Sequence, residues 1–147
     1  MAEKIKLDSV DRQILHDLQD HGRMTNVDLA KNAGISAPPC LRRVRALEDA
    51  GIIKGYHADI DSDALGYSVH VFAFVGLTSQ AETDLQDFEM LVSTWPQVRE
   101  CHMLMGETDF LLKIVAHDWD DFQKFLTSHL TPAKNVSHVK TALSIRS

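Results

Sequence analysis

A chain of 147 residues can hold one ordinary domain or two small ones, and its apolar fraction of 44% is enough for a packed core. No apolar run is long enough to cross a membrane, and the charged first residues do not resemble a secretion signal. Its two cysteines, Cys40 and Cys101, lack metal-ligand spacing. We therefore expect a cytoplasmic protein with reduced thiols and with neither a metal nor a cofactor.

The net charge of -6 is unfavourable for binding nucleic acid, but it is unevenly distributed. Residues 1–60 carry nine basic and nine acidic side chains, whereas residues 61–147 carry six and twelve. Three arginines gather within residues 42–45 of the first half. An oligomer would present several such basic segments together and so offset the acidic second half.

The chain begins with two short helices. The first is expected from Asp8 or Ser9, either of which can cap it, to about residue 20, with apolar residues at helical spacing. The second begins after Thr25, which forms a capping-box-like start with Asp28. Gly34 suits the left-handed turn that ends this helix.

A third helix is expected after Ser36, with Pro38 and Pro39 in its first turn, where backbone N–H groups lack intrahelical partners. The residues expected to face inward recur at helical spacing and are Cys40, Leu41, Val44 and Leu47. The basic residues outside this stripe are Arg42, Arg43 and Arg45. Two helices joined by a tight glycine turn, with arginines on the second, predict a helix-turn-helix whose second helix enters the DNA major groove.

The arginines allow more than one interpretation. On DNA, Arg42 can bond guanine in the major groove, whereas Ser36, Arg43 and Arg45 suit phosphate contacts. Arginines on a helix are often only a solvated face, and Arg43 has the further alternative of pairing within the protein, for example with Asp11. The joint occurrence of caps, glycine turn, arginines and a following strand-like segment favours DNA binding.

The second half is expected to combine strands with helices, unlike the helical first half. Residues 52–61 are expected to form a strand or hairpin arm, and a polar stretch at 61–66 separates a domain of residues 1–60 from one of residues 61–147. The elements expected in the second domain are a strand at 67–77, a helix at 81–95, strands at 98–105 and 109–116, a helix capped by Asp118 and a strand at 136–145. The core side of the last helix is expected to include Trp119.

This βαββαβ order predicts a ferredoxin-like domain with both helices on one face of the sheet. The first strand is apolar on both faces, because Phe72 and Phe74 lie opposite a row of valines. An apolar open face needs a cover, so we expect it to form a dimer interface.

Five motifs occur in order: LDSVDRQILHDLQ, SAPPCLRRVRALE, GIIKGY, ECH at 100–102 and GETDFLLK at 106–113. Together they resemble the Lrp/AsnC family of bacterial and archaeal transcription regulators over almost the whole chain. The resemblance implies an α+β chain with an N-terminal winged-type helix-turn-helix and a C-terminal ferredoxin-like domain. It also implies homodimers built by the C-terminal domains, which assemble into tetramers or octamers.

The resemblance further implies a small effector, usually an amino acid, bound near a glycine loop between subunits. The residues of this loop are Gly106, Glu107, Thr108 and Asp109. A loop N–H can meet a ligand carboxylate and an acid can meet an ammonium group, whereas the alternative is an ordinary turn in which Gly106 supplies a positive φ. The chain departs from the family pattern at residues 131–135 and at Pro38, where the family often has Thr or Ser and a possible polar contact to DNA.

We therefore predict a sequence-specific regulator of transcription that binds double-stranded DNA and a small effector, an amino acid, and that is not an enzyme. One alternative is an enzyme of the same fold, similar to sirohaem decarboxylases, which would need a damaged recognition helix. Another is a ligand-sensing interaction module without DNA binding, which would need the arginines to be buried or paired. No catalytic triad, paired carboxylates or phosphate loop stands out in the sequence.

Overall fold

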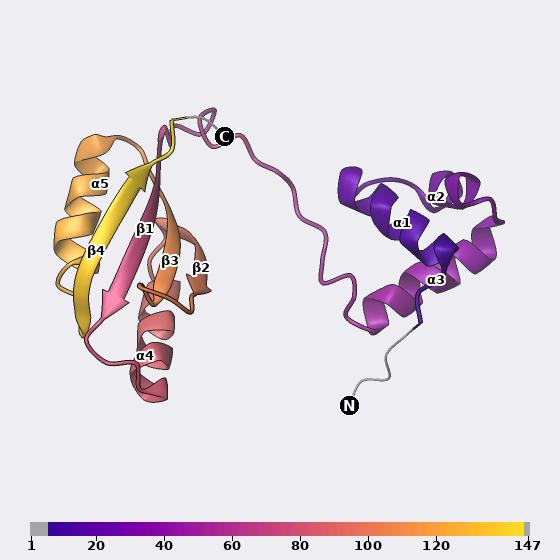
Figure 1. Cartoon of the computed structure of the whole chain (residues 1–147). Coiled ribbons are helices and arrows are strands. Elements are labelled where there is room, and N and C mark those ends of the chain that lie inside the picture. Colours follow the sequence, from indigo (N-terminus) through magenta and orange to yellow (C-terminus); the bar gives the residue numbers. More distant parts are fainter. Residues whose placement is uncertain (1–5, 146–147) are drawn as a thin grey trace. The chain divides into compact units, whose positions relative to one another are not determined.

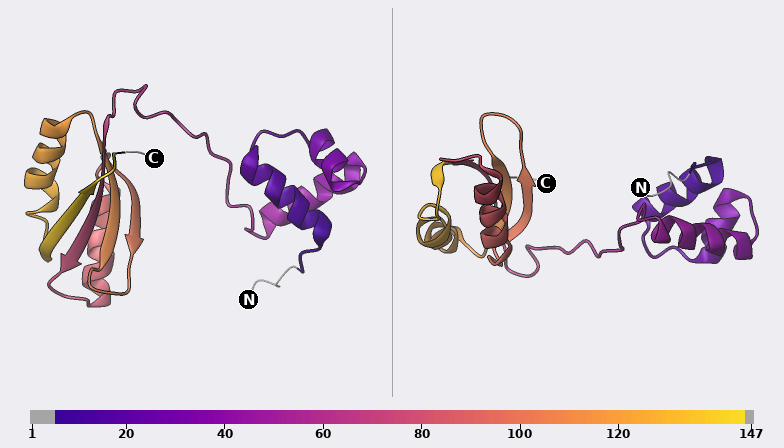
Figure 2. Two further views of the ribbon diagram at one scale, coloured as in Figure 1. Left: turned by 45° about the horizontal axis from the view of Figure 1, so that its top comes forward. Right: turned by 90° about the horizontal axis from the view of Figure 1, so that it is seen from below.

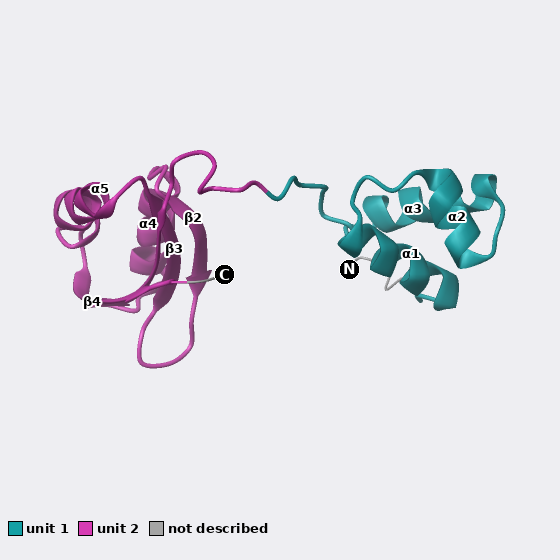
Figure 3. Ribbon diagram, turned by 90° about the horizontal axis from the view of Figure 1, so that it is seen from above, with its two compact units in different colours: residues 1–59 teal, residues 60–147 magenta. Residues whose placement is uncertain are grey.

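The computed structural model describes residues 6–145. The chain divides into two compact units, the first ending at Asp59 and the second beginning at Ile60 (Figure 3). Each unit encloses a hydrophobic core of its own. Every helix within residues 6–145 is too short or too polar to span a membrane.

The first unit contains three helices, α1 (Ser9–Asp20), α2 (Asn26–Ala33) and α3 (Ala37–Asp49), as the sequence predicts (Figure 1). Asp8 caps α1 by accepting the Asp11 N–H at 2.9 Å, and the Asp11 carboxylate accepts the Asp8 N–H at 3.1 Å. Thr25 caps α2, and its hydroxyl oxygen accepts the Asp28 N–H at 3.2 Å. Gly34 ends α2 at φ 70°, a conformation that glycine adopts without steric cost.

The core of the first unit joins all three helices. Ile14 of α1 is fully buried, and Leu29 and Ala30 of α2 are each only 3% exposed. The buried residues of α3 are Cys40, Val44 and Leu47. The prediction that Leu41 also faces inward is wrong, because it lies at the edge of this stripe and is 38% exposed.

The strand or hairpin arm expected over residues 52–61 is not formed. The segment is irregular and largely exposed, with Ile60 at 59%. A strand needs a neighbour for its backbone N–H and C=O groups, and no other segment of residues 6–145 pairs with this one. Tyr56 instead donates its hydroxyl to Glu48 at 2.8 Å, and partial burial together with this bond raises the pKa of Tyr56 to about 12.

The second unit has the predicted βαββαβ order. Its elements are β1 (Val69–Leu77), α4 (Glu82–Ser93), β2 (Val98–Met103), β3 (Phe110–Ala116), α5 (Trp119–Phe125), a π-helical turn η1 (Leu126–Leu130) and β4 (Val136–Leu143) (Figure 1). The sheet order is β2-β3-β1-β4 with antiparallel neighbours throughout. The predicted fold class, a helix-turn-helix unit followed by a ferredoxin-like unit, is therefore confirmed.

The strand β1 lies at the centre of this sheet and alternates between two environments. Ala73 and Val75 are fully buried and pair with Leu112 and Phe110 of β3. The helices α4 and α5 cover this face with aromatic and aliphatic side chains that include Phe88, Val92, Phe122 and Phe125. Phe72 and Phe74 are only half-buried because they lie on the opposite face, which neither helix covers.

The start of α5 differs from expectation in one residue. Asp118 caps the helix by accepting the Asp121 N–H at 2.8 Å, as predicted. The prediction that Trp119 belongs to the core is wrong, because this residue is 50% exposed. Its indole packs against Phe122 from the solvent side, with ring centroids 5.3 Å apart.

Two aromatic truncations test this arrangement. Phe110→Ala should cost about 3–5 kcal/mol of stability, because the ring is fully buried and packs against Phe88. Trp119→Ala removes a larger but half-exposed ring and should cost clearly less. Urea unfolding followed by far-ultraviolet circular dichroism measures both; a larger loss for Trp119→Ala would contradict the assignment of Trp119 to the surface.

Candidate DNA-binding helix and effector loop

One face of α3 is turned away from the core of the first unit. The exposed residues Pro38, Leu41, Arg42 and Arg45 share it at spacings of three and four. Within the part of the chain that the structure describes, Arg42 and Arg45 take part in no ion pair. Both guanidinium groups are therefore available to solvent or to an external partner, whereas the alternative of a module without DNA binding needs the arginines to be buried or paired.

The first turn of α3 offers fewer donors than its sequence suggested. Ser36 occupies the capping position, but its side chain makes no capping hydrogen bond. Pro38 and Pro39 have no N–H, and the Cys40 N–H bonds the Ser36 carbonyl at 3.3 Å. Any phosphate bound here would thus meet the Ala37 N–H and the Ser36 hydroxyl rather than a full set of backbone amides.

Arg43 points in another direction and is held by the protein itself. Its Nη1 lies 2.7 Å from Oδ2 of Asp8 and 2.9 Å from Oδ1 of Asp11. These hydrogen bonds raise the pKa of Arg43. The Asp11 N–H and then Arg43 lower the pKa of Asp8. The intraprotein pair, the alternative left open for Arg43, is the arrangement found and ties α3 to the start of α1, whereas a phosphate contact of Arg43 stays a prediction.

The predicted effector residues lie on the connection between β2 and β3, the orange loop that projects from the sheet in Figure 2. Gly106 and Glu107 are exposed, whereas Thr108 and Asp109 are half-buried. Gly106 is not among the glycines with positive φ, which are Gly34, Gly51 and Gly66. The alternative that Gly106 is needed for a positive φ in a turn is therefore wrong.

Asp109 is the best-fixed residue of this loop. Its Oδ2 accepts hydrogen bonds from the Leu77 N–H at 2.7 Å and from Nε2 of Gln80 at 3.3 Å. Its backbone N–H donates to the Val75 carbonyl at 2.9 Å, and its carbonyl accepts the Leu104 N–H at 2.7 Å. Asp109 thus joins the loop to the end of β1, and its carboxylate has a fixed position before any ligand arrives.

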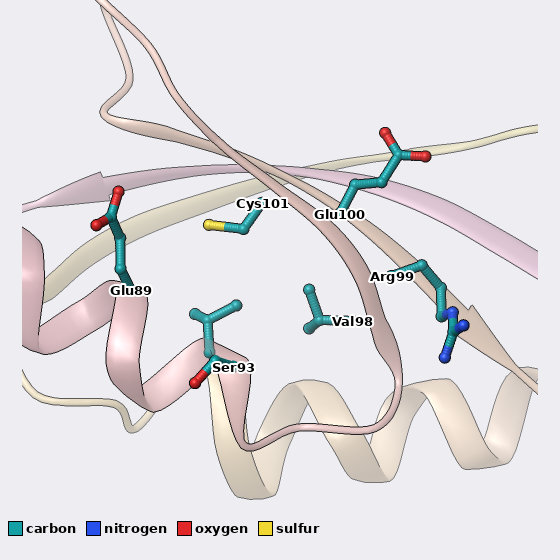
Figure 4. Close-up of a pocket in the computed structure, with 7 residues that line it drawn as sticks. Glu89, Ser93, Val98, Arg99, Glu100 and Cys101 are labelled. Carbon is teal, nitrogen blue, oxygen red and sulfur yellow. The ribbon is translucent and has the colours of Figure 1, made fainter. Parts of the chain in front are cut away.

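A hollow of about 290 Å³ lies elsewhere, between α4 and the edge strand β2 (Figure 4). It is lined by Glu89, Val92, Ser93, Val98, Arg99, Glu100 and Cys101. Desolvation and then the charge of Glu89 raise the pKa of Cys101. None of the four predicted loop residues lines this hollow, and no periodicity in the sequence indicated it.

Family models match both units of the chain. A model described as the Lrp/AsnC ligand binding domain matches residues 70–147, and one described as a winged helix-turn-helix DNA-binding domain matches residues 7–54. The chain belongs to the Lrp/AsnC family. The resemblance seen in the sequence is thereby confirmed.

Two relatives named as regulators extend the similarity over the whole chain. The leucine-responsive regulatory protein of Rhizobium meliloti (strain 1021) is 50% identical over 146 residues, which cover 99% of this chain and 94% of the relative. The Bkd operon transcriptional regulator of Pseudomonas aeruginosa is 40% identical over 147 residues, covering 100% and 94%. Such names are those of regulators rather than of enzymes.

Solved structures of the Lrp/AsnC family show the same architecture. A transcriptional regulator from Neisseria meningitidis, solved as a complex with L-Met, matches with a TM-score of 0.90 and 35% identity, covering 96% of this chain and 91% of that chain. AsnC of Escherichia coli matches with a TM-score of 0.86 and 25% identity, covering 97% and 95%.

The ion pairs of Arg43 predict a pH-dependent contribution to stability. Arg43→Gln should destabilise the first unit near neutral pH, because Asp8 and Asp11 lose their cation. Since the pKa of Asp8 is lowered by folding, its stabilisation is present above the ordinary value of 3.8 and is lost as the pH falls through the lowered value. The stability gap between parent and variant should therefore narrow below pH 3.8.

Urea titrations between pH 7 and pH 3, followed by circular dichroism, measure this gap. Arg42→Gln is the matched control, since its side chain is exposed and outside any ion pair in residues 6–145. A gap of the same size at pH 3 and pH 7, or an equal loss in the control, would contradict the role given to Arg43.

Proposed function

We propose that this chain is a sequence-specific DNA-binding transcriptional regulator that acts in the cytoplasm on double-stranded DNA and inserts α3 into the major groove. The observation that carries this proposal is the outward face of α3, which presents Arg42 and Arg45 with no competing ion pair among the described residues. The family match to a DNA-binding helix-turn-helix over residues 7–54 supports the same role.

The candidate DNA-binding residues divide by chemistry. The exposed guanidinium of Arg42 suits two hydrogen bonds with the O6 and N7 atoms of a guanine. Arg45 and the Ser36 hydroxyl suit phosphate contacts, which fix the position of the helix without reading sequence. Pro38 contributes shape rather than hydrogen bonds, and Arg43 acts indirectly by holding α3 against α1.

We propose further that the protein is a homodimer, built through the open face of its C-terminal sheet, that assembles into tetramers or octamers. Half-buried Phe72 and Phe74 lie on this face, and Phe74 pairs across strands with Leu111. Lys113 pairs in register with Phe72 on the same face and forms an ion pair with Glu100 at 3.1 Å, so this face combines apolar and charged groups. Light scattering of the parent protein measures the number of chains.

The proposed effector is an amino acid bound at the loop of Gly106, Glu107, Thr108 and Asp109. The exposed backbone of Gly106 and Glu107 can donate N–H groups to a carboxylate, while the fixed carboxylate of Asp109 can accept an ammonium group. The L-Met complex of the Neisseria meningitidis relative supports an amino acid as the ligand class.

The DNA proposal predicts different outcomes for the two exposed arginines. Arg42→Ala should cost about 1–3 kcal/mol at the preferred site and relax base preference there. Arg45→Ala should weaken binding to all sequences alike and reduce the salt dependence by about one phosphate contact. Fluorescence anisotropy with DNA from upstream of the chain's own gene and with a scrambled duplex measures both effects.

The matched control is Arg12→Ala, which removes an exposed arginine of α1 and should leave binding unchanged. The assignment of α3 fails if Arg42→Ala binds the preferred and scrambled duplexes as the parent does.

Two substitutions at Asp109 separate an effector contact from a structural role. Asp109→Asn keeps an acceptor for the Leu77 N–H but removes the charge, whereas Asp109→Ala removes both. Both should lose amino-acid binding, while only Asp109→Ala should lose stability, by about 1–3 kcal/mol. Calorimetry against the twenty amino acids and thermal unfolding measure the two effects, with Glu107→Gln as the exposed control. If the parent binds no amino acid, or if Asp109→Asn binds one as well as the parent, the site is wrong.

A further inference from the structure

The exposed face of α3, formed by Pro38, Leu41, Arg42 and Arg45, contains apolar residues as well as arginines. Leu41 is 38% exposed, whereas Cys40, Val44 and Leu47 of the same helix are at most 9% exposed. Apolar residues at the margin of the first unit, such as Ile35 and Ile53, are half-buried against its core, whereas Leu41 is one of its exposed large apolar residues. The side chain of Leu41 therefore leaves part of its apolar surface exposed on the outer side of α3.

The position of Leu41 on the helix places it among the candidate DNA contacts. Pro38 precedes it by three residues and Arg45 follows it by four, and both spacings place side chains on one side of a helix. Arg42 is its immediate neighbour. The same face thus presents two cations and two apolar groups.

Charge limits the part of this face that DNA can approach. The exposed residues Glu48 and Asp49 end α3 with two carboxylates. The Glu48 carboxylate accepts a hydrogen bond from the Tyr56 hydroxyl at 2.8 Å. Carboxylates are repelled by phosphates, so contact with DNA is confined to the N-terminal part of α3, residues 36–45. Leu41 lies near the middle of that stretch.

The chemical groups exposed in the DNA major groove determine which base Leu41 could contact. Among the four bases, only thymine presents an apolar group, its C5-methyl, to the major groove. Phosphates and the edges of the other bases present polar groups, against which a leucine side chain gains nothing.

We propose that Leu41 is a specificity-determining residue that packs on the 5-methyl group of a thymine lying beside the guanine bound by Arg42. The inference rests on the proposed function, because it requires α3 in the major groove. It adds that the recognised half-site contains a guanine with a thymine within about two base pairs, the span that neighbouring residues of one helix can reach.

The test removes one methyl group from the DNA and one side chain from the protein. Sequences bound by the full-length parent are first selected from a random pool of duplexes. Each thymine of the selected site is then replaced singly by deoxyuridine, which lacks only the 5-methyl group. The parent should lose about three- to tenfold in affinity at one thymine of each half-site, the range expected for one buried methyl group.

Leu41→Ala should lose a similar factor on unmodified DNA and should be insensitive to deoxyuridine at that one thymine, so that the two losses do not add. Met90→Ala is the matched control, since it truncates a residue that is 63% exposed on α4 of the other unit and should retain the full deoxyuridine effect. Arg42→Ala should also retain it, because the arginine does not contact the methyl group.

The remaining outcomes overturn the inference in distinguishable ways. A selected half-site without thymine, or a Leu41→Ala variant as sensitive to deoxyuridine as the parent, shows that Leu41 does not read the methyl group while DNA binding stands. A Leu41→Ala variant with an altered mass by light scattering shows that the residue covers a protein contact instead. If the parent enriches no sequence at all, the proposed function fails first, and this inference fails with it.

Discussion

Two ion pairs join α3 to the start of α1, where Asp8 and Asp11 hold Arg43 beside the core that the three helices share. The same two carboxylates cap α1 through their reciprocal bonds to backbone N–H groups, so one pair of side chains both starts a helix and fixes the direction of another. Because residues on a helix keep fixed angular offsets, directing Arg43 toward α1 leaves Arg42 and Arg45 on the outward side. The structure thus separates Arg43, which is paired, from Arg42 and Arg45, which are exposed, although the three look equivalent in the sequence.

Local signals in the sequence predicted most of the fold. Asp8, Thr25, Gly34 and Asp118 mark helix ends through short-range hydrogen bonds or a required φ, and the structure places each as expected. The errors concern properties that depend on neighbours distant in the chain. Leu41 has helical spacing but lies beyond the edge of its core, and residues 52–61 have strand-like composition but no strand beside them.

The candidate site also has features that the sequence indicated and features that only the structure revealed. The residue types of α3 indicated a surface for DNA, but only the structure could show that Arg43 is paired and that Pro38 and Pro39 leave few amides at the helix start. The bond between Asp109 and Leu77 joins residues 32 positions apart, and no spacing rule predicts such a contact. The hollow beside Cys101 likewise arises where α4 meets β2, through packing that leaves no periodic trace.

The contacts of Asp109 link the proposed effector loop to the proposed dimer interface. Asp109 bonds the backbone of β1 at Val75 and Leu77, and the same strand carries Phe72 and Phe74 on the open face of the sheet. A ligand that bonds the Asp109 carboxylate would thus compete with or reinforce the hydrogen bonds that fix the end of this strand. A ligand shifts an assembly only if it binds one form better than another, and under the proposal a strand shared by the loop and the interface is where such a difference would arise. The acidic second unit disfavours the approach of DNA phosphates. The exposed arginines of a single α3 attract DNA only weakly, so several copies of α3 in one assembly would bind DNA more tightly than one.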